Sequence, residues 1–426
     1  MNGLTQRLLP GASALDLRLI GFGCLVYMFS GVGQSYFFQF IRPDVMADFG
    51  MTEDQWGTFY MLGTLASGFA IMLTGRIFDW FDLRVVTIVV IVGAALSCFF
   101  FANVTLIWML VPAIFLQRQF GQGLMSHVPA AAMSRYFTDL RGRATGLCNA
   151  SYSAAEALLP QFAGLVLIIV LTWRGLYETL GLVLLVLVLP LALWLLRGHG
   201  QRHQAYLASQ TIEDGLTSDT PPVPGSRRRQ WTLPEVIGDP TAWMLMPTIF
   251  APSFIFTGLV VFGLDYASEL GVSENGWRFL WMIYALFGFA ITFPIGWVVD
   301  RFTATRLAPF TALPMALALF AVQPFNGAII GGVMLLLWSA CQVFTSIVSG
   351  PLLAELYGVK HLGAIKSAYT SVMVAASAGG PFVVGRLLSE GWSLKQISLV
   401  FALYILAAAV LAMLAVARLD VKPLTK

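Results

Sequence analysis

Long apolar runs alternate with short polar segments along nearly the whole chain. Twelve of these runs reach roughly 20 residues, the length that an α-helix needs to cross a bilayer. They do not show the apolar–polar alternation of membrane barrel strands. We therefore predict an all-α membrane protein with twelve transmembrane helices. The predicted spans are 17–41, 55–75, 85–103, 105–134, 144–171, 175–196, 241–264, 277–298, 307–323, 327–353, 364–388 and 397–417.

One polar stretch, residues 198–240, interrupts this pattern midway along the chain. It contains Pro-Pro-Val-Pro-Gly at 221–225 and three consecutive arginines at 227–229, and it has too little apolar content to form a packed core. We interpret it as a cytoplasmic linker, with a short surface helix as one option. The predicted domains are an N-terminal six-helix bundle (1–197), the linker, and a C-terminal six-helix bundle (241–426).

The two halves of the chain repeat one another at an offset of 221 residues. Gly75-Arg-Ile-Phe-Asp79 corresponds to Gly296-Trp-Val-Val-Asp300, and further pairs follow in the same order. Such internal repeats in an apolar chain are typical of secondary transporters. They predict two pseudo-symmetric bundles. The other matching pairs are Tyr136 with Tyr357, Gly142 with Gly363, Pro160 with Pro381, and Gly164 with Gly385.

Composition agrees with a membrane protein and argues against several other classes. Charged residues make up 11% of the chain and hydrophobic residues 58%, whereas an ordinary soluble domain is about 25% charged. The net charge of +3 comes without a basic, aromatic-rich block, so we expect no nucleic-acid partner. No cluster has metal-ligand spacing, and no phosphate loop or nucleophile–base pair occurs. We expect no enzyme, no cofactor and no metal, and we expect a monomer embedded in membrane lipid.

Basic residues indicate the orientation of the predicted helices. With the N-terminus inside, the inner loops and tails hold 19 lysines and arginines and the outer ends hold five. This bias predicts that both termini face the cytoplasm. Compact loops suit a bacterial inner (plasma) membrane.

The loop between the second and third spans resembles the most specific motif of the major facilitator superfamily. That motif has a glycine, an aspartate four residues later, and a basic turn. The resemblance covers essentially the whole chain and implies two six-helix bundles with cytoplasmic latches. An alternative is a solvated loop that only fixes topology. The implied gating residues are Gly75, Asp79 and Arg84 in the first copy and Gly296, Asp300 and Arg306 in the second.

A second motif loosely resembles the monocarboxylate and oxalate–formate branch of that superfamily. It reads Arg135-Tyr136-Phe137 followed by Arg141-Gly142-Arg143. The branch usually carries an arginine in the middle of the eighth helix. Here that region, Phe289 to Gly296, has no charged residue. The anion site of the branch therefore cannot be transferred directly to this chain.

Two charged residues fall in the middle of predicted spans. Arg118 lies about 13 residues into the fourth span, and Glu156 about 13 residues into the fifth. A charge at that depth costs at least ~2.5–3.5 kcal/mol on insertion scales, so it faces a partner or a water-filled cavity. The two helices are consecutive, which makes a direct pair plausible. The alternative is a pair that only holds two helices in register.

Other polar residues are expected to line the same cavity. Gln122 is one helical turn from Arg118, and Asn149 is on the face of the fifth span that carries Glu156. Gln34 adds a polar group from the first span, and Ser339 and Gln342 share a polar stripe on the tenth.

We hypothesise proton-coupled uptake of a small organic anion. The anion would bind Arg118, and Glu156, having lost its counter-charge, would capture a proton. The expected partners are a small-molecule substrate and protons. One alternative is an antiporter that exports lipophilic or cationic compounds. A remote alternative is a membrane sensor that moves no cargo.

Overall fold

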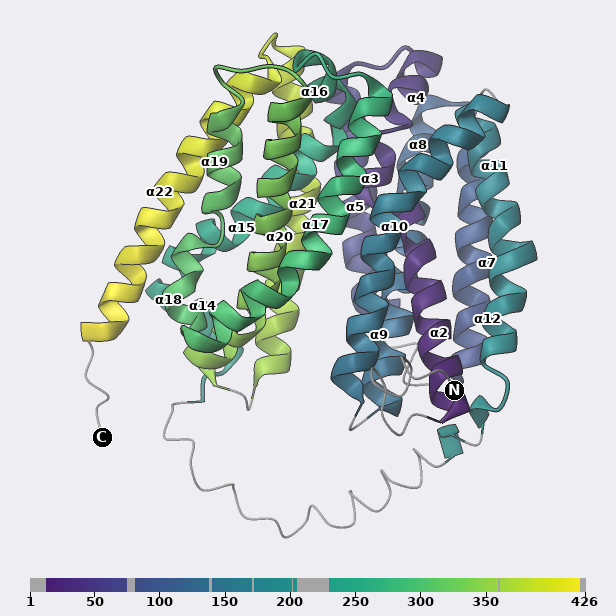
Figure 1. Ribbon diagram of the computed structural model, residues 1–426, viewed down its shortest axis with the longest axis horizontal. Coiled ribbons are helices and arrows are strands. Elements are labelled where there is room, and N and C mark those ends of the chain that lie inside the picture. The colour runs from purple at the N-terminus through teal and green to yellow at the C-terminus, as the bar shows by residue number, and fades with distance from the viewer. Residues whose placement is uncertain are drawn as a thin grey trace. The chain divides into compact units, whose positions relative to one another are not determined.

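The computed structural model describes residues 13–74, 81–137, 140–170, 172–200, 202–204, 230–358 and 361–421. Within these residues every regular element is a helix and no strand occurs, which confirms the predicted all-α fold (Figure 1). Backbone groups in hydrocarbon have no water to bond with, so a spanning segment must satisfy them internally. Among the described residues, nine helices are long and apolar enough to cross a membrane.

The first half of the chain supplies helices for six of the predicted spans. The fourth span is built from four consecutive helical segments, and the sixth from three. The elements are α2 (Ala14–Phe29), η1 (Ser30–Gly33), α3 (Ser35–Phe38), α4 (Arg42–Phe49), α5 (Glu53–Thr74), α7 (Leu83–Ala102), η2 (Ile107–Met109), α8 (Leu110–Leu116), η3 (Gln117–Leu124), α9 (Met125–Tyr136), α10 (Arg141–Val170), α11 (Trp173–Val183), η4 (Leu184–Val188) and α12 (Leu189–Leu195).

The second half supplies helices for the other six spans, together with one short helix in the predicted linker. The elements are α14 (Leu233–Ile237), α15 (Pro240–Val261), α16 (Gly263–Glu269), α17 (Glu274–Arg301), α18 (Ala304–Leu307), η5 (Ala308–Phe310), α19 (Leu313–Ala321), α20 (Ala328–Tyr357), α21 (Leu362–Ser389) and α22 (Leu394–Val421).

Within the described part of the chain, four of the predicted spans contain irregular helix, including a π-helical segment at Leu184–Val188 and a 3₁₀ turn at Ala308–Phe310. In the predicted span 17–41, α2 gives way to the 3₁₀ turn η1, and Gln34 is then extended, with ψ of 154°. In the predicted span 105–134, η3 is a π-helical segment. Hydropathy predicts these spans but not their irregularities, because a 3₁₀, π or α turn can form from the same residues.

The described residues belong to two compact units. Unit 1 comprises Met1–Phe37, Phe69–Ala155 and Phe162–Arg227, and unit 2 comprises Phe38–Gly68, Glu156–Gln161 and Arg228–Lys426. The units do not follow the sequence boundaries at 197 and 241, because pieces of the first half group with the second. The division into two six-helix bundles therefore stays a prediction.

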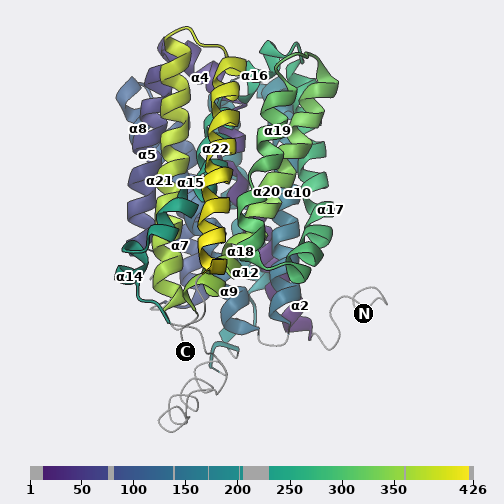
Figure 2. The same cartoon turned by 90° about the vertical axis from the view of Figure 1, so that its left-hand side faces the viewer.

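Aromatic rings and close backbone contacts hold each unit together. In unit 1, Phe101 of α7 stacks on Tyr177 of α11 with ring centroids 4.5 Å apart. In unit 2, α15 and α21 run side by side, and a Cβ at Gly380 would lie 2.1 Å from the carbonyl oxygen of Phe254 (Figure 2). Since the obstacle is backbone, only glycine permits this helix contact.

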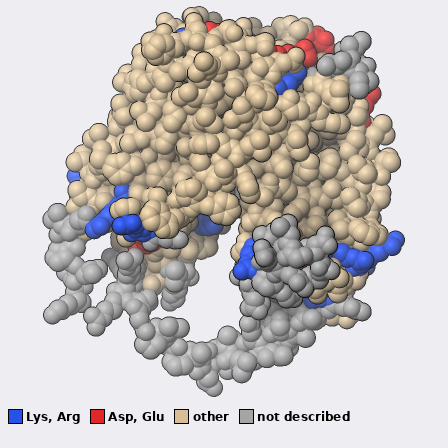
Figure 3. Space-filling view, viewed as in Figure 1, with Lys and Arg blue, Asp and Glu red and all other residues tan. Residues whose placement is uncertain are grey.

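Side-chain caps fix where several helices begin. Ser13 and Asp16 form a reciprocal capping box at the start of α2, and Asp239 accepts a hydrogen bond from Thr241 N, 3.0 Å away, at the start of α15. These caps satisfy backbone donors that the first helical turn leaves open. In Figure 3, the middle of the visible face carries few charged side chains, and Lys, Arg, Asp and Glu lie near its upper and lower edges. This distribution is typical of a protein that spans a bilayer.

Candidate functional site

Arg118 lies in unit 1 beside the interruption in the first span. It is part of η3, its side chain is 3% exposed, and its Nη1 donates to Gly33 O at 3.3 Å and to Ser35 Oγ at 3.2 Å. The 3₁₀ turn ends at Gly33, so the carbonyl there has left the α-helical hydrogen-bond pattern and can accept from a side chain. The buried cation and the helix interruption therefore form one local structure.

Other polar side chains are buried around Arg118. Gln117 and Gln119 are 1% and 3% exposed, and Gln119 Nε2 donates to Thr74 Oγ1 at 2.8 Å. Gln34, which sequence analysis placed at the site, is 8% exposed and directly follows the 3₁₀ turn. Unit 1 thus buries several polar side chains along η3, and Gln119 faces the second span while Arg118 faces the first.

The remaining predicted residues of unit 1 differ in their placement. Gln122 is half-buried, and its backbone nitrogen lies close to Gly33. Asn149 is exposed on α10. Its neighbour Tyr152 packs against Tyr27 at 5.2 Å between ring centroids. The structure therefore places Gln34 and Gln122 close to the interruption that Arg118 contacts, and it gives Asn149 no contact there among the described residues.

Gly33 provides a direct test of this packing. A Cβ at Gly33 would lie 2.3 Å from Gln117 O and 2.6 Å from Gln122 N, and backbone atoms cannot move aside cheaply. We expect Gly33→Ala to destabilise the protein by roughly 1–3 kcal/mol, the usual cost of overpacking. The matched control is Gly146→Ala in α10, where a Cβ would meet nothing within 4 Å. The melting temperature in detergent should fall only for Gly33→Ala, and equal melting temperatures would contradict this packing.

Glu156 lies in unit 2, in a half-buried position on α10. Its carboxyl is within electrostatic range of the Tyr284 hydroxyl on α17. Tyr284 stacks on Trp281 with ring centroids 4.7 Å apart. Glu156 therefore stands beside an aromatic cluster, where a charge has little water to stabilise it. Because Arg118 belongs to unit 1, a direct Arg118–Glu156 pair stays a prediction.

The two predicted donors of α20 also lie in unit 2. Ser339 is 2% exposed, and its hydroxyl donates to Tyr284 O at 2.9 Å. Ser339 thus connects α20 to α17 in this state. Gln342 is half-buried. Their assignment to substrate binding stays a prediction.

The first predicted latch is only partly described. Gly75 and Asp79 lie outside the described residues. Arg84 is exposed, and its Nε and Nη2 donate to Leu196 O at 3.3 and 3.0 Å. A cation at the C-terminal end of α12 is favourable because carbonyl groups there point toward it. Arg84 thereby ties the start of α7 to the end of α12.

The second predicted latch is bonded by a carboxylate that the sequence did not indicate, Glu355. Gly296 and Arg306 are described, at half-buried and exposed positions, whereas the Asp300 side chain lies outside the described residues. At Gly296 a Cβ would meet nothing within 4 Å. Glu355 of α20 accepts from Ala304 N at 3.0 Å and Thr305 N at 2.9 Å. Glu355 thus caps α18, the kind of contact expected of a latch carboxylate.

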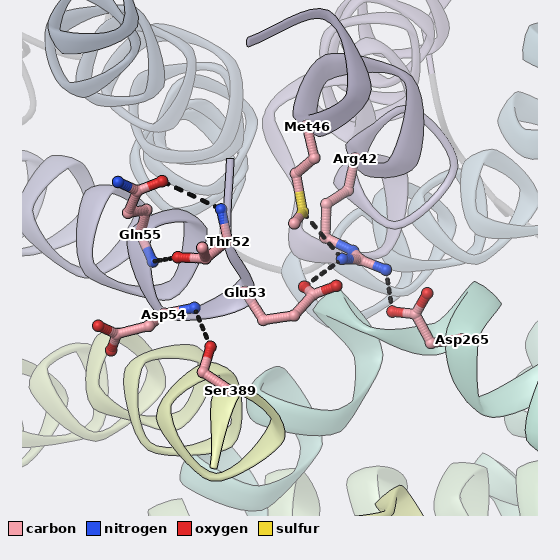
Figure 4. A network of polar contacts seen from close by, with 8 residues as sticks. All are labelled: Arg42, Met46, Thr52, Glu53, Asp54, Gln55, Asp265 and Ser389. Atoms are coloured by element: carbon pink, nitrogen blue, oxygen red, sulfur yellow. Dashed lines mark hydrogen bonds and ion pairs between the residues drawn. The ribbon is translucent and has the colours of Figure 1, made fainter. Parts of the chain in front are cut away.

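A second charged cluster joins α4, α5 and α16 (Figure 4), at the end of unit 2 opposite α18 (Figure 1). Arg42 is 1% exposed, its Nη1 lies 2.6 Å from Glu53 Oε2, and its Nη2 pairs with Asp265. The guanidinium also lies 4.8 Å from the centroid of the Phe262 ring. Arg42 and Glu53 come from the first half of the sequence and Asp265 from the second. We call Arg42, Glu53 and Asp265 the Arg42 cluster.

Burial and the neighbouring carboxylate shift the pKa of Arg42 in opposite directions. Loss of solvent lowers the pKa of Arg42 to about 10, and the negative charge of Glu53 opposes that change. Arg42 therefore stays cationic at neutral pH. Nearby, Asp54 N donates to Ser389 Oγ at 3.1 Å, which joins the start of α5 to the end of α21 (Figure 4). These ends of helices from both sequence halves are thus held together inside unit 2.

The Arg42 cluster had a weak signal in the sequence. At the offset of 221 residues Asp265 of α16 corresponds to Asp44 of α4, so a carboxylate recurs in this short helix in both halves. Nothing in the spacing identifies the buried arginine that pairs with it. Long-range ion pairs of this kind depend on how loops fold together, which hydropathy does not describe.

Comparison with known proteins identifies the fold. The sequence pattern of the Major Facilitator Superfamily matches residues 23–381, which is most of the chain. Among solved structures, a bacterial homologue of the human lysosomal transporter Spinster, inward-facing and unoccupied, has a TM-score of 0.65 at 14% identity, covering 96% of this chain and 98% of that one. Its inward-facing, occupied form gives 0.66 at 15% identity, covering the same shares.

A D-xylose–proton symporter gives a TM-score of 0.63 at 16% identity, covering 92% of this chain and 95% of that one. No curated protein matches the sequence. At such low identity the structural likeness shows the fold alone, whereas the sequence pattern covers far more than half of the chain. The chain therefore belongs to the major facilitator superfamily and is a multi-pass integral membrane transporter, not an enzyme.

Proposed function

We propose that this protein carries a small organic anion across the membrane together with a proton. The observation that carries the proposal is the burial of Arg118, 3% exposed, in the middle of a span. Placing an ionisable residue at that depth costs free energy, so such a residue is a functional candidate by default. Gln34 and Gln122, close to the same helix interruption, supply amide donors that can orient a carboxylate. The D-xylose–proton symporter shows that another protein of this fold serves proton symport.

In this proposal the anion binds to the guanidinium of Arg118, which suits the planar, two-oxygen geometry of a carboxylate. Gln34 and Gln122 would complete the contacts, with Ser339 and Gln342 approaching from the second half of the chain. Binding adds a negative charge to a region of low dielectric. A second negative charge on Glu156 then becomes unfavourable, which favours its protonated form. Anion and proton would move together.

Replacing Glu156 tests whether this residue couples transport of the anion to transport of a proton. Glu156→Gln has the shape of the protonated carboxyl but cannot release a proton. We expect exchange of labelled for unlabelled anion to stay within about two-fold of the wild type, while accumulation driven by a pH gradient is lost. Uptake into proteoliposomes with and without an imposed gradient measures both.

The matched control is Glu178→Gln, the same chemical change at an exposed position of α11. Its exchange and its gradient-driven uptake should both equal those of the wild type. If Glu156→Gln still accumulates substrate against a pH gradient, Glu156 is not the coupling residue.

Alternating access would open the two ends of the spans in turn. We propose that the Arg42 cluster closes the outer end and that the two loops with Asp79, Arg84, Asp300 and Arg306 close the cytoplasmic end. Glu355 joins the second of these latches by capping α18. We place both termini in the cytoplasm and the protein in a bacterial inner membrane, as the distribution of basic residues predicts.

A ligand screen identifies the substrate class. The purified protein should gain thermal stability in the presence of the correct ligand, because ligand binding to the folded state alone stabilises it. We expect shifts with mono- or dicarboxylates and none with amines or neutral sugars. Stabilisation by lipophilic cations instead would favour the exporter alternative.

A further inference from the structure

An apolar cavity of about 270 Å³ lies in unit 2, at the end where α15 begins. Short helix α14 borders it on one side and α15, α20 and α21 on the others, and Figure 2 shows α14 beside α15 and α21. An engineered cavity of about 150 Å³ is enough to hold benzene. This cavity can therefore hold a chain of several methylene groups. The residues that line the cavity include Ile237, Ala242, Trp243, Tyr357, Ala368 and Val372.

The lining is unsuited to water or to a polar ligand. None of the described lining residues is charged, and most are leucine, isoleucine, valine, alanine or methionine. A polar side chain at the wall, Tyr357, directs its hydroxyl to Asp239 Oδ2, 3.5 Å away. Ordered water needs two to four polar partners, which these walls do not offer. An apolar ligand is the occupant that fits.

The cavity is a fixed part of the fold. Trp231 N donates to Tyr357 O at 3.0 Å, and the Trp231 ring packs on the Tyr357 ring at 5.7 Å between centroids. Trp243 Nε1 donates to Ile237 O at 2.7 Å. These contacts hold both ends of α14 on the helices beneath it.

The rim of the cavity continues onto an apolar surface. Ile237 is 57% exposed and Trp243 58%, and Val372 is also exposed. A molecule with two apolar chains could place one chain in the cavity and the other along this surface. Phospholipids have this form, and they surround the spanning part of a membrane protein.

Basic side chains flank α15 at the same end of unit 2. Lys366 on α21 is exposed and directly follows Ile365, which lines the cavity. Arg418 on α22 is exposed, and its Nη1 lies 3.3 Å from Met244 Sδ on α15. Basic groups at helix ends attract anionic lipid headgroups.

We propose that this cavity binds one acyl chain of an anionic phospholipid whose headgroup lies at Lys366, with Arg418 adding positive charge on the other flank of α15. The second acyl chain lies outside, along Trp243 and Val372. The site is independent of Arg118 and Glu156, so the proposal does not rest on the transported substrate.

The test compares two phospholipids with the same oleoyl chains, an anionic phosphatidylglycerol and a zwitterionic phosphatidylcholine. The full-length protein is delipidated in detergent, each lipid is added back, and bound lipids are counted by native mass spectrometry. We expect one phosphatidylglycerol to be retained at least about 10-fold more tightly than phosphatidylcholine. Equal retention of the two lipids by the wild type would overturn the proposal.

Two kinds of substitution distinguish the binding of the acyl chain from the binding of the lipid headgroup. Ala368→Trp fills the cavity and should abolish the tightly retained lipid, and Ala242→Trp serves the same purpose if the first variant does not fold. Lys366→Gln should keep a bound lipid but lose the preference for phosphatidylglycerol. The matched control is Leu403→Trp, a similar enlargement at a position of α22 that is 54% exposed, and it should change nothing. Retention of phosphatidylglycerol by both cavity-filling variants contradicts the proposal.

A third comparison adds oleate alone. A single-chain anion should bind more weakly than phosphatidylglycerol, because the outer chain then makes no contact with Trp243 and Val372. If oleate displaces phosphatidylglycerol at equal concentration, the occupant is a fatty acid, and the phospholipid assignment is wrong.

Discussion

Arg118→Ala is expected to abolish substrate binding and transport. Truncating one partner of a buried charge pair costs about 2–5 kcal/mol, so the dissociation constant of the anion should rise about 30-fold or more. The measurement is the thermal shift produced by the best carboxylate from the screen, followed by uptake into proteoliposomes. Arg118→Lys keeps the charge but loses the planar fork, and we expect it to bind weakly.

Arg118 also contacts Gly33 and Ser35, so its loss can lower stability for a purely structural reason. The control is Arg174→Ala, because Arg174 also bonds a backbone carbonyl of unit 1, Val104 O at 2.9 Å, but near the end of a span. Both variants can melt earlier than the wild type. Only Arg118→Ala should lose the shift caused by ligand. If the ligand raises the melting temperature of that variant as much as that of the wild type, Arg118 stabilises the fold but does not bind the ligand.

Arg42→Gln is expected to open the outer end of the protein. Removing one partner of a buried ion pair costs about 3–5 kcal/mol, and we use the lower value because Glu53 and Asp265 are 32% and 39% exposed. The equilibrium between closed and open outer ends should then shift by about 100-fold. A thiol introduced by Val45→Cys, at a position 0% exposed in this structure, should react correspondingly faster with a membrane-impermeant maleimide.

The matched control for Arg42 is Arg386→Gln. Arg386 also forms ion pairs at this end, with Asp54 at 3.7 Å and Glu390 at 2.9 Å, but its side chain is 58% exposed. Exposed pairs contribute roughly 0–1 kcal/mol, so labelling should change by less than about five-fold. Equal labelling rates for Arg42→Gln and the wild type would show that the Arg42 cluster does not hold this end closed.

The fold could be predicted from the sequence because hydrocarbon imposes a strict condition on the backbone. A run of about 20 apolar residues has almost no alternative to a helix, and the repeat of Gly75 to Asp79 at Gly296 to Asp300 indicated the family. The interruption at Ser30–Gly33 was not predicted, since it falls within a run whose overall hydropathy still suits a spanning helix. The π-helical segment at Gln117–Leu124 was missed for the same reason.

The site could be predicted only in part. Arg118 and Glu156 stand out because a charge within a span is rare, and that signal needs no knowledge of tertiary structure. The contact between Arg118 and the carbonyl of Gly33 depends on where the first helix is interrupted. Glu355 and the Arg42 cluster lie at helix ends, where charged residues are common and the sequence does not show which of them meet.

The interruption of the first helix has a mechanical consequence. The chain passes from unit 1 to unit 2 between Phe37 and Phe38, a few residues after the extended Gln34. A hinge needs only a few residues that absorb a change in backbone torsion, and a segment outside the α-helical ladder absorbs it at low cost. Among the described residues, the other crossings are at Gly68–Phe69 in α5 and at Ala155–Glu156 and Gln161–Phe162 in α10, and they lie within long helices. We expect the first helix to bend at Gln34. The guanidinium of Arg118 contacts Gly33 and Ser35, on either side of that residue, so the bending would change its hydrogen bonds.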